Sequence, residues 1–212
     1  MKNLIINNTI NNIQKYYKYD DIKLKEIKYG LETLYLTIFK TIVVFIISAL
    51  INTTKELLLI FIFYGLLRLT GFGLHAKRSI DCWISSLILF VGIPILCQKL
   101  TIDINMASTI LMIALILLFI YAPADTEKRP LINKKKRIIY KLLTSITTIV
   151  YIFIINLTKN ITLQNTLFFS ILIETLLILP ISYKLFGLKY NNYKNYKKGE
   201  RKWNYLLQLQ LL

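Results

Sequence analysis

The stretch RLTGFGLHAKRSIDCW, residues Arg68–Trp83, separates two long apolar runs of the chain. It holds the only histidine of the protein, His75, and one of its two cysteines, Cys82. Because apolar segments flank it on both sides, this polar stretch must lie at a membrane face or in a cavity between helices. We call residues 68–83 the His–Cys stretch, and its polar side chains make it the first candidate for a functional site.

The composition indicates a membrane protein. Of the 212 residues, 55% are hydrophobic, which exceeds the usual content of soluble domains. Runs such as Ile42–Ile51 and Ile104–Tyr121 are too long and too uniform for surface elements, and a bilayer span needs about 20 mostly apolar residues. We therefore expect an all-α fold: a polytopic membrane bundle of six transmembrane helices in one membrane-embedded domain, residues 1–212. The expected spans are residues 34–51, 57–69, 83–97, 104–121, 138–156 and 162–183.

The formal net charge of +16 is distributed unevenly between the gaps. Of the 27 Lys and Arg residues, 22 lie before the first span, in the His–Cys stretch, between the fourth and fifth spans, or after the sixth, whereas the other gaps hold 3. Cytoplasmic loops are enriched in Lys and Arg, so both termini and the His–Cys stretch are predicted to be cytoplasmic. Six spans is the only count that keeps this alternation. Basic residues in such loops fit topology and anionic lipid headgroups better than nucleic acid, and we expect no nucleic-acid partner.

Both terminal segments are polar. Residues 1–28 have no apolar core of the kind found in signal peptides, so we expect no cleavable signal. Their weak amphipathic pattern, followed by interleaved Lys and Tyr, fits either a helix on the membrane surface or a loosely ordered cytoplasmic tail. Residues 184–212 form a basic, tyrosine-rich tail, which we expect to be cytoplasmic.

Cys82 is the candidate nucleophile. A nucleophilic cysteine reacts as the thiolate and needs a base, and His75 is the only imidazole in the chain. Lys77 and Arg78 make the neighbourhood electropositive, and the expected start of the third span at Cys82 would supply unpaired helix N–H groups. Cys97 would lie about 22 Å away along a helix, too far for a disulfide, and we interpret it as structural. One His and two separated Cys do not make a metal site, so we expect no metal and no cofactor.

The spacing of His75 and Cys82 excludes a straight helix between them. Seven helical residues would separate the two side chains by about 10 Å along the axis, whereas a hydrogen-bonded pair needs about 3 Å. We therefore predict a break within residues 76–81, or a geometry that closes only with substrate. Ser79 and Asp81 are candidate caps of the following helix. Asp81 orienting His75 as a third catalytic member is the alternative.

Three further charged features accompany the stretch. Glu174 lies within the sixth span and should face the bundle interior, where we expect it to pair with Lys40 or Lys141 in a structural role. Asp125 either acts near the active site or caps a turn. The basic run 134–137 is interpreted as a topology signal that also suits an acidic peptide segment.

The chain resembles the accessory gene regulator B family, the membrane peptidases of peptide quorum-sensing systems in Gram-positive bacteria. The resemblance rests on Arg68, Gly73 and the His75-x6-Cys82 spacing, together with six spans and the later loop Tyr121-Ala122-Pro123-Ala124-Asp125-Thr126 followed by Arg129-Pro130. It covers essentially the whole chain.

The resemblance implies Cys82 and His75 as catalytic residues, with Arg68 and Gly73 needed nearby. It implies that the family's basic cluster falls on Lys134, Lys135 and Lys136. The implied substrate is a quorum-sensing propeptide with an acidic C-terminal tail, from which a Cys82 thioester would be formed and then closed into a thiolactone or lactone ring. It also implies a homodimer, a multi-pass location in the cell membrane, and an active site on the cytoplasmic side.

Two other functions compete with this one. The first is a small peptide transporter that uses intramembrane charges, and the second is a non-catalytic adaptor that binds a partner through its basic loops. The peptidase predicts that Cys82→Ala abolishes function while Cys97→Ala is tolerated. A transporter predicts indifference at Cys82, and an adaptor predicts sensitivity mainly at residues 134–137.

Overall fold

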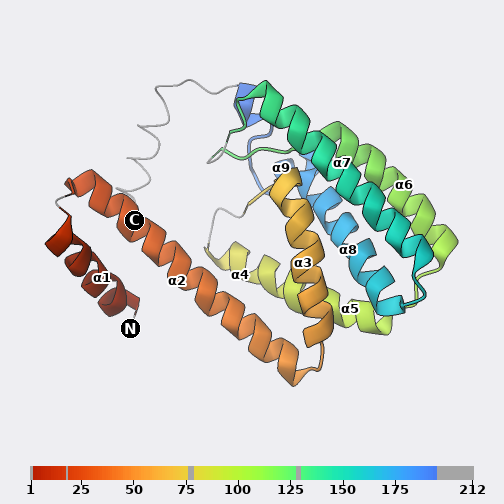
Figure 1. The fold of residues 1–212 in the computed structure, drawn as a ribbon, viewed down its shortest axis with the longest axis horizontal. Coiled ribbons are helices and arrows are strands. Elements are labelled where there is room, and N and C mark those ends of the chain that lie inside the picture. The colour runs from red at the N-terminus through yellow and green to blue at the C-terminus, as the bar shows by residue number, and fades with distance from the viewer. Residues whose placement is uncertain (1, 18, 76–78, 128–129, 195–212) are drawn as a thin grey trace. The chain divides into compact units, whose positions relative to one another are not determined.

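The structure is a computed structural model that describes residues 2–17, 19–75, 79–127 and 130–194, and in these ranges every regular element is a helix. The chain forms two compact units, Met1–Ile46 and Ile47–Tyr196 within the described residues. The expectation of a single domain stays a prediction. The elements are α1 Lys2–Tyr16, α2 Asp21–Leu50, α3 Thr54–Gly71, α4 Ser79–Leu87, a π-helical turn Ile88–Gly92, α5 Ile93–Lys99, α6 Ile104–Tyr121, α7 Lys134–Leu157, α8 Ile161–Ile178, α9 Pro180–Leu185 and a 3-10 turn Asn192–Lys194 (Figure 1).

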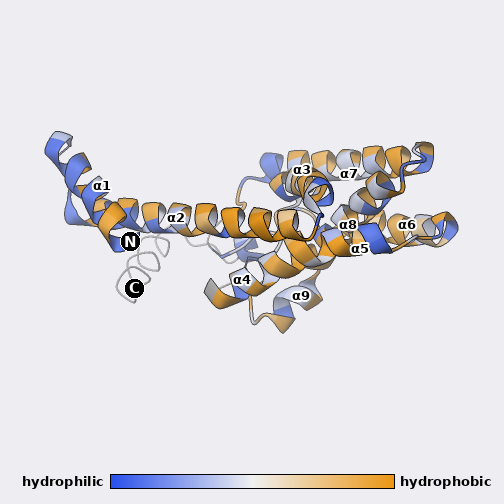
Figure 2. Ribbon diagram, turned by 90° about the horizontal axis from the view of Figure 1, so that it is seen from below, coloured by the Kyte–Doolittle hydropathy of each residue, from blue (hydrophilic) through white to orange (hydrophobic). Residues whose placement is uncertain are grey.

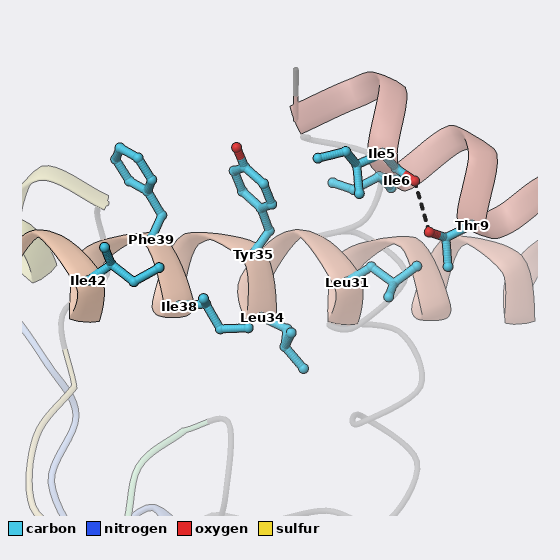
Figure 3. Close-up of a pocket in the computed structure, with 9 residues that line it drawn as sticks. All are labelled: Ile5, Ile6, Thr9, Leu31, Leu34, Tyr35, Ile38, Phe39 and Ile42. Carbon is cyan, nitrogen blue, oxygen red and sulfur yellow. Dashed lines mark hydrogen bonds between the residues drawn. The ribbon is translucent and has the colours of Figure 1, made fainter.

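The first unit consists of α1 and the first part of α2. Figure 3 shows α1 lying along α2, with a groove of about 230 Å³ lined by apolar side chains such as Ile5, Tyr35 and Phe39. Residues 2–16 are helical, which agrees with the helical interpretation of the N-terminal segment. Its position on a membrane surface stays a prediction.

The second unit is built around α8. Residues 165–171 of this helix are all buried, so it is covered on every side. A helix that is buried all round needs neighbours on each face. α3, α5, α6 and α7 supply them, and each of these helices contacts α8 (Figure 1).

Five helices within the described residues are long and apolar enough to cross a membrane: Asp21–Leu50, Ile80–Lys99, Ile104–Tyr121, Lys134–Leu157 and Ile161–Ile178. Their exposed faces carry large apolar side chains such as Ile113, Ile116 and Phe153, and hydrophobic residues cover most of α2 and α6 in Figure 2. The prediction of an all-α fold with several membrane-spanning helices is therefore confirmed. The expected second span is α3, whose 18 residues include Lys55, Glu56 and Arg68, so a count of six stays a prediction.

Prolines alter two of the expected spans, and the third span, Ile80–Lys99, is also longer at both ends than the expected 83–97. In the third span, Ile93 N–H donates to Ile88 O across a π-helical turn, and Pro94 next to it has no N–H for an α-helical bond. The sixth span was expected to continue to Tyr183, but α8 ends at Ile178. Pro180 holds Leu179 extended (φ −64°, ψ 139°), and the chain resumes as α9.

A polar cluster closes the end of the second unit at the α2–α3 turn. Gln98 Nε2 donates to Asn52 O (2.8 Å) and to Glu56 Oε2 (3.0 Å). Asn165 Nδ2 donates to the carbonyls of Cys97 (2.9 Å) and Leu100 (2.7 Å). These bonds fix the C-terminal end of α5, where Cys97 is buried among core residues.

Candidate functional site

The backbone just before His75 is anchored to two distant segments. Gly73 N–H donates to Ala124 O (2.8 Å), and Ala124 N–H donates to Gly71 O (2.9 Å). Leu74 N–H donates to Leu177 O (3.0 Å) near the end of α8. We call residues 71–74 the anchored loop, because three backbone hydrogen bonds fix it to the loop after α6 and to α8.

Arg68 in the last turn of α3 completes this anchoring. Its guanidinium Nη2 donates to Gly73 O (3.3 Å) and to Leu74 O, while Nη1 lies 3.6 Å from Glu174 Oε2 on α8. Glu174 therefore pairs with Arg68, and its predicted pairing with Lys141 is wrong; Lys40 belongs to the other unit, so its pairing with Glu174 stays a prediction. The packing of α3 on α8 brings Arg68 to Glu174 instead, and Lys141 Nζ lies 5.3 Å from the centre of the Phe119 ring.

Residue 73 must be a glycine for two reasons: its backbone conformation and the closeness of the Arg68 guanidinium. Its φ of +81° lies in the left-handed region that favours glycine. A Cβ atom at this position would lie 2.2 Å from Arg68 Nη1 and 3.0 Å from Leu177 O. Any side chain here would push away the guanidinium that holds the anchored loop.

His75 follows the anchored loop directly, is exposed, and lies outside any helix. Cys82 is half-buried and is the fourth residue of α4, in the first turn of that helix. His75 lies outside any helix and α4 begins at Ser79, so the two residues do not share a straight helix, and the predicted break within residues 76–81 falls in part outside the described residues. Ala76, Lys77 and Arg78 lie outside the described residues. Asp81 lies inside the first turn of α4 and not at its cap position, since α4 begins at Ser79.

Asp125 is buried and joins two loops. Its Oδ2 accepts from the N–H groups of Tyr193 (2.8 Å) and Leu131 (3.2 Å), and its Oδ1 accepts from Asn192 N–H (3.1 Å). Burial raises the pKa of the Asp125 carboxyl above its usual range, although these N–H groups and Arg137 favour its charged form. The geometry agrees with the turn-capping interpretation, because the carboxylate is occupied by backbone groups.

Tyr183 of α9 contacts the loop that holds Ala124 and Asp125. Its hydroxyl donates to the carbonyls of Ala124 (3.0 Å) and Asp125 (3.2 Å), and its ring packs edge-on against Tyr190 at 5.1 Å. Sequence reasoning missed Tyr183, Leu177 and Asn192 as parts of this site. No local motif marks them. Leu177 lies at the end of α8 and the other two residues follow it, so each is far in sequence from the loop that it contacts.

The basic cluster Lys134, Lys135 and Lys136 forms the exposed first turn of α7. Asn133 caps this turn by accepting from the N–H groups of Lys135 (3.0 Å) and Lys136 (3.3 Å). Phe72 packs edge-on against Tyr140 at 5.2 Å, so the start of α7 lies at the same end of the unit as the anchored loop. The segments 72–75, 122–127, 130–133 and 179–194 thus gather at one end. Lys128, Arg129 and the tail residues 195–212 lie outside the described residues.

Within the described part of the chain, no group of three His, Cys, Asp or Glu side chains could hold a metal ion. Neither Cys82 nor Cys97, both described, forms a disulfide. The fold and site together define a helical membrane protein in which His75 and the basic cluster lie on segments at one end of the second unit, and Cys82 lies in the first turn of α4.

Comparison with known proteins identifies the family. The family described as Accessory gene regulator B matches residues 6–178, and the chain belongs to this family. A putative AgrB-like protein of Clostridium acetobutylicum is 32% identical over 88% of this chain and 89% of its own length. One from Listeria welshimeri is 30% identical over 85% and 89%. The accessory gene regulator protein B of Staphylococcus epidermidis is 31% identical over 80% and 86%. No solved structure matches.

Proposed function

We propose that this protein is a membrane cysteine endopeptidase that removes the C-terminal tail of a quorum-sensing propeptide and promotes cyclisation of the remaining segment. Membership of the accessory gene regulator B family supports a role in quorum-sensing peptide processing. The proposed catalytic residues are Cys82 as nucleophile and His75 as base.

One observation carries the proposal. The anchored loop directly precedes His75, and its conformation is fixed by three backbone hydrogen bonds and by Arg68. A catalytic base requires this kind of fixed position, because small misplacements of reacting groups cost large factors in rate. Cys82 lies at the start of α4, where helix N–H groups favour a thiolate and are suited to binding an oxyanion.

The chemistry proceeds by two acyl transfers. His75 takes the thiol proton of Cys82, and the sulfur attacks the carbonyl carbon of the bond before the tail. That C–N bond breaks, and the leaving amine takes the proton from His75. A Cys or Ser side chain of the propeptide then gives its proton to His75 and attacks the thioester. The new thiolactone or lactone bond closes the ring, and Cys82 recovers its proton.

The remaining parts of the proposal concern substrate and location. The exposed amines of Lys134, Lys135 and Lys136 would attract the acidic tail of the propeptide. The concentration of Lys and Arg in the gaps that gather at this end favours a cytoplasmic active site in a multi-pass protein of the cell membrane. The proposed assembly is a homodimer in membrane lipid, with residues 1–212 acting as one peptidase domain.

The test uses the purified protein in lipid vesicles with its candidate propeptide, followed by mass spectrometry. Wild type and Cys97→Ala should release the tail and leave a fragment one water lighter than its hydrolysed form. Cys82→Ala should leave the propeptide intact. Cys97→Ala is the matched control, because it removes the other thiol of the chain.

The outcome also separates the peptidase from a transporter. Glu174 does not discriminate between the two functions, because its contact with Arg68 makes it important to the anchored loop in either case. Cys82 still does. Full function of Cys82→Ala would contradict the peptidase and favour transport.

A further inference from the structure

Two glycines frame the ion pair between Arg68 and Glu174. A Cβ atom on Gly71 would lie 2.3 Å from Glu174 Oε1, just as a Cβ atom on Gly73 would lie 2.2 Å from Arg68 Nη1. Each glycine therefore leaves the space that one partner of the pair occupies. By contrast, a Cβ atom on Gly65, in the same helix as Gly71, would meet nothing within 4 Å.

Glu174 is an unusual residue for the centre of a bundle. It is fully buried, and neither of its carboxylate oxygens accepts a hydrogen bond from the described residues. Its charged contact is Arg68 Nη1 at 3.6 Å. A buried ion pair is often no more stable than apolar residues of the same volume, so stability alone does not explain it.

The geometry of Arg68 shows what the pair does. One nitrogen of its planar guanidinium faces Glu174, while the other donates to the carbonyls of Gly73 and Leu74. The guanidinium is a rigid fork, so fixing one nitrogen fixes the direction of the other. The Arg68 side chain is 24% exposed, and without a buried anion it is free to turn toward water or lipid headgroups.

We propose that Glu174 is a positioning residue: it holds the Arg68 guanidinium against the Gly73 and Leu74 carbonyls and so fixes the backbone that carries His75. Glu174 itself touches neither substrate nor the reacting atoms. Gly71 contributes to the same positioning, because the absence of a side chain there leaves room for the Glu174 carboxylate. This inference rests on the proposed peptidase function.

The first test is kinetic. Glu174→Gln keeps the size of the side chain and removes its charge. Propeptide cleavage should show kcat lower by about 100-fold with KM nearly unchanged, because the base is misplaced while the substrate-binding surface is intact. Ser170→Ala is the control on the same helix, since the buried Ser170 hydroxyl donates to the Thr166 carbonyl of α8 itself and, among the described residues, to no other group. A wild-type kcat in Glu174→Gln would overturn the proposal.

The second test is a double-mutant cycle between Gly71 and Glu174. Gly71→Ala alone should lower kcat, whereas Gly65→Ala should not. In a Glu174→Ala background the carboxylate is gone, so adding Gly71→Ala should cause no further loss. Multiplicative losses in the double variant would show that Gly71 does not serve Glu174, and would contradict the proposed positioning.

A third variant separates positioning from folding. Arg68→Met with Glu174→Met replaces the buried pair by apolar side chains, a change that buried ion pairs often tolerate. The variant should remain monodisperse in detergent with a wild-type melting temperature, yet its kcat should fall as in Glu174→Gln. Wild-type kinetics in this folded variant would overturn the inference.

Cys82→Ala is measured in parallel to separate the inference from the proposed function. Activity of Cys82→Ala would refute the peptidase itself. An inactive Cys82→Ala beside a fully active Glu174→Gln would refute only the role of Glu174.

Discussion

The carbonyl of Leu177 accepts a hydrogen bond from Leu74 N–H (3.0 Å) because α8 ends one residue later. In a continuous helix this carbonyl would bond to the N–H of residue 181. Pro180 prevents that continuation, since it holds Leu179 in an extended conformation. The helix break that sequence reasoning overlooked therefore frees the acceptor that anchors the backbone before His75.

Replacing Pro180 tests this relationship. In Pro180→Ala, α8 is able to continue and recover the Leu177 carbonyl for its own helix, so the Leu74 anchor weakens. The loss of about one hydrogen bond corresponds to about 1 kcal/mol, or roughly fivefold in the ratio of anchored to released loop. Propeptide cleavage should fall, by at most this factor. Ile181→Ala, at an exposed neighbouring residue, should cleave at the wild-type rate, and equal rates in both variants would contradict the anchoring role.

Tyr183 and Tyr190 form a matched pair of tyrosines. Tyr183→Phe removes a buried hydroxyl that donates to two carbonyls of the 122–125 loop, whereas Tyr190→Phe removes one longer bond to Tyr121 O (3.4 Å). Tyr183→Phe should cost about 1–2 kcal/mol, which lowers the melting temperature by roughly 2–8 °C in a protein of this size. Thermal unfolding in detergent measures the difference. An equal or larger loss in Tyr190→Phe would contradict the support assigned to Tyr183.

Asp125 predicts a pH dependence of stability. Burial raises the pKa of its carboxyl in the folded protein above the ordinary value of 3.8, so between these two pKa values the folded protein binds the proton more tightly than the unfolded chain. The contribution of this group to the free energy of unfolding therefore increases as the pH falls through the folded-state pKa, and is constant at higher pH. The melting temperature of wild type minus that of Asp125→Asn should therefore increase as the pH is lowered from 7 to 4.

The control for this titration is Asp103→Asn, which changes an exposed helix cap on α6. Its difference from wild type should not show the same gain on acidification. If the melting temperatures of wild type and Asp125→Asn stay a constant distance apart over this range, the carboxyl does not titrate as inferred.

The basic cluster on α7 predicts an ionic-strength effect on substrate binding. Changing Lys134, Lys135 and Lys136 to Glu should raise KM for an acidic-tailed propeptide by roughly tenfold at low salt, at about 0.5 kcal/mol for each substituted residue. The effect should shrink at high salt, because these charges are exposed. Lys159→Glu, in the loop between α7 and α8, is the control. A salt-independent rise in KM would point to a structural cause.

The sequence predicts the helices better than their contacts. Long apolar runs and the gaps between them place most helices, because burial in lipid leaves a strong compositional signal. Glu174 was correctly expected to face the interior, but its partner depends on which helices pack together, and periodicity does not reveal that α3 lies on α8. Likewise, Pro180 is visible in the sequence, but its effect on Leu74 depends on a contact between segments about 100 residues apart, which the sequence does not reveal.

The measurement closest to the central claim is intact-mass spectrometry of the protein after acid quenching of the reaction with its propeptide. The account predicts a covalent adduct with the mass of the propeptide without its tail, mapped to Cys82 and removed by hydroxylamine as a thioester. It should be absent in Cys82→Ala and present in Cys97→Ala. An adduct on Cys97, or release of the tail by Cys82→Ala, would contradict the account.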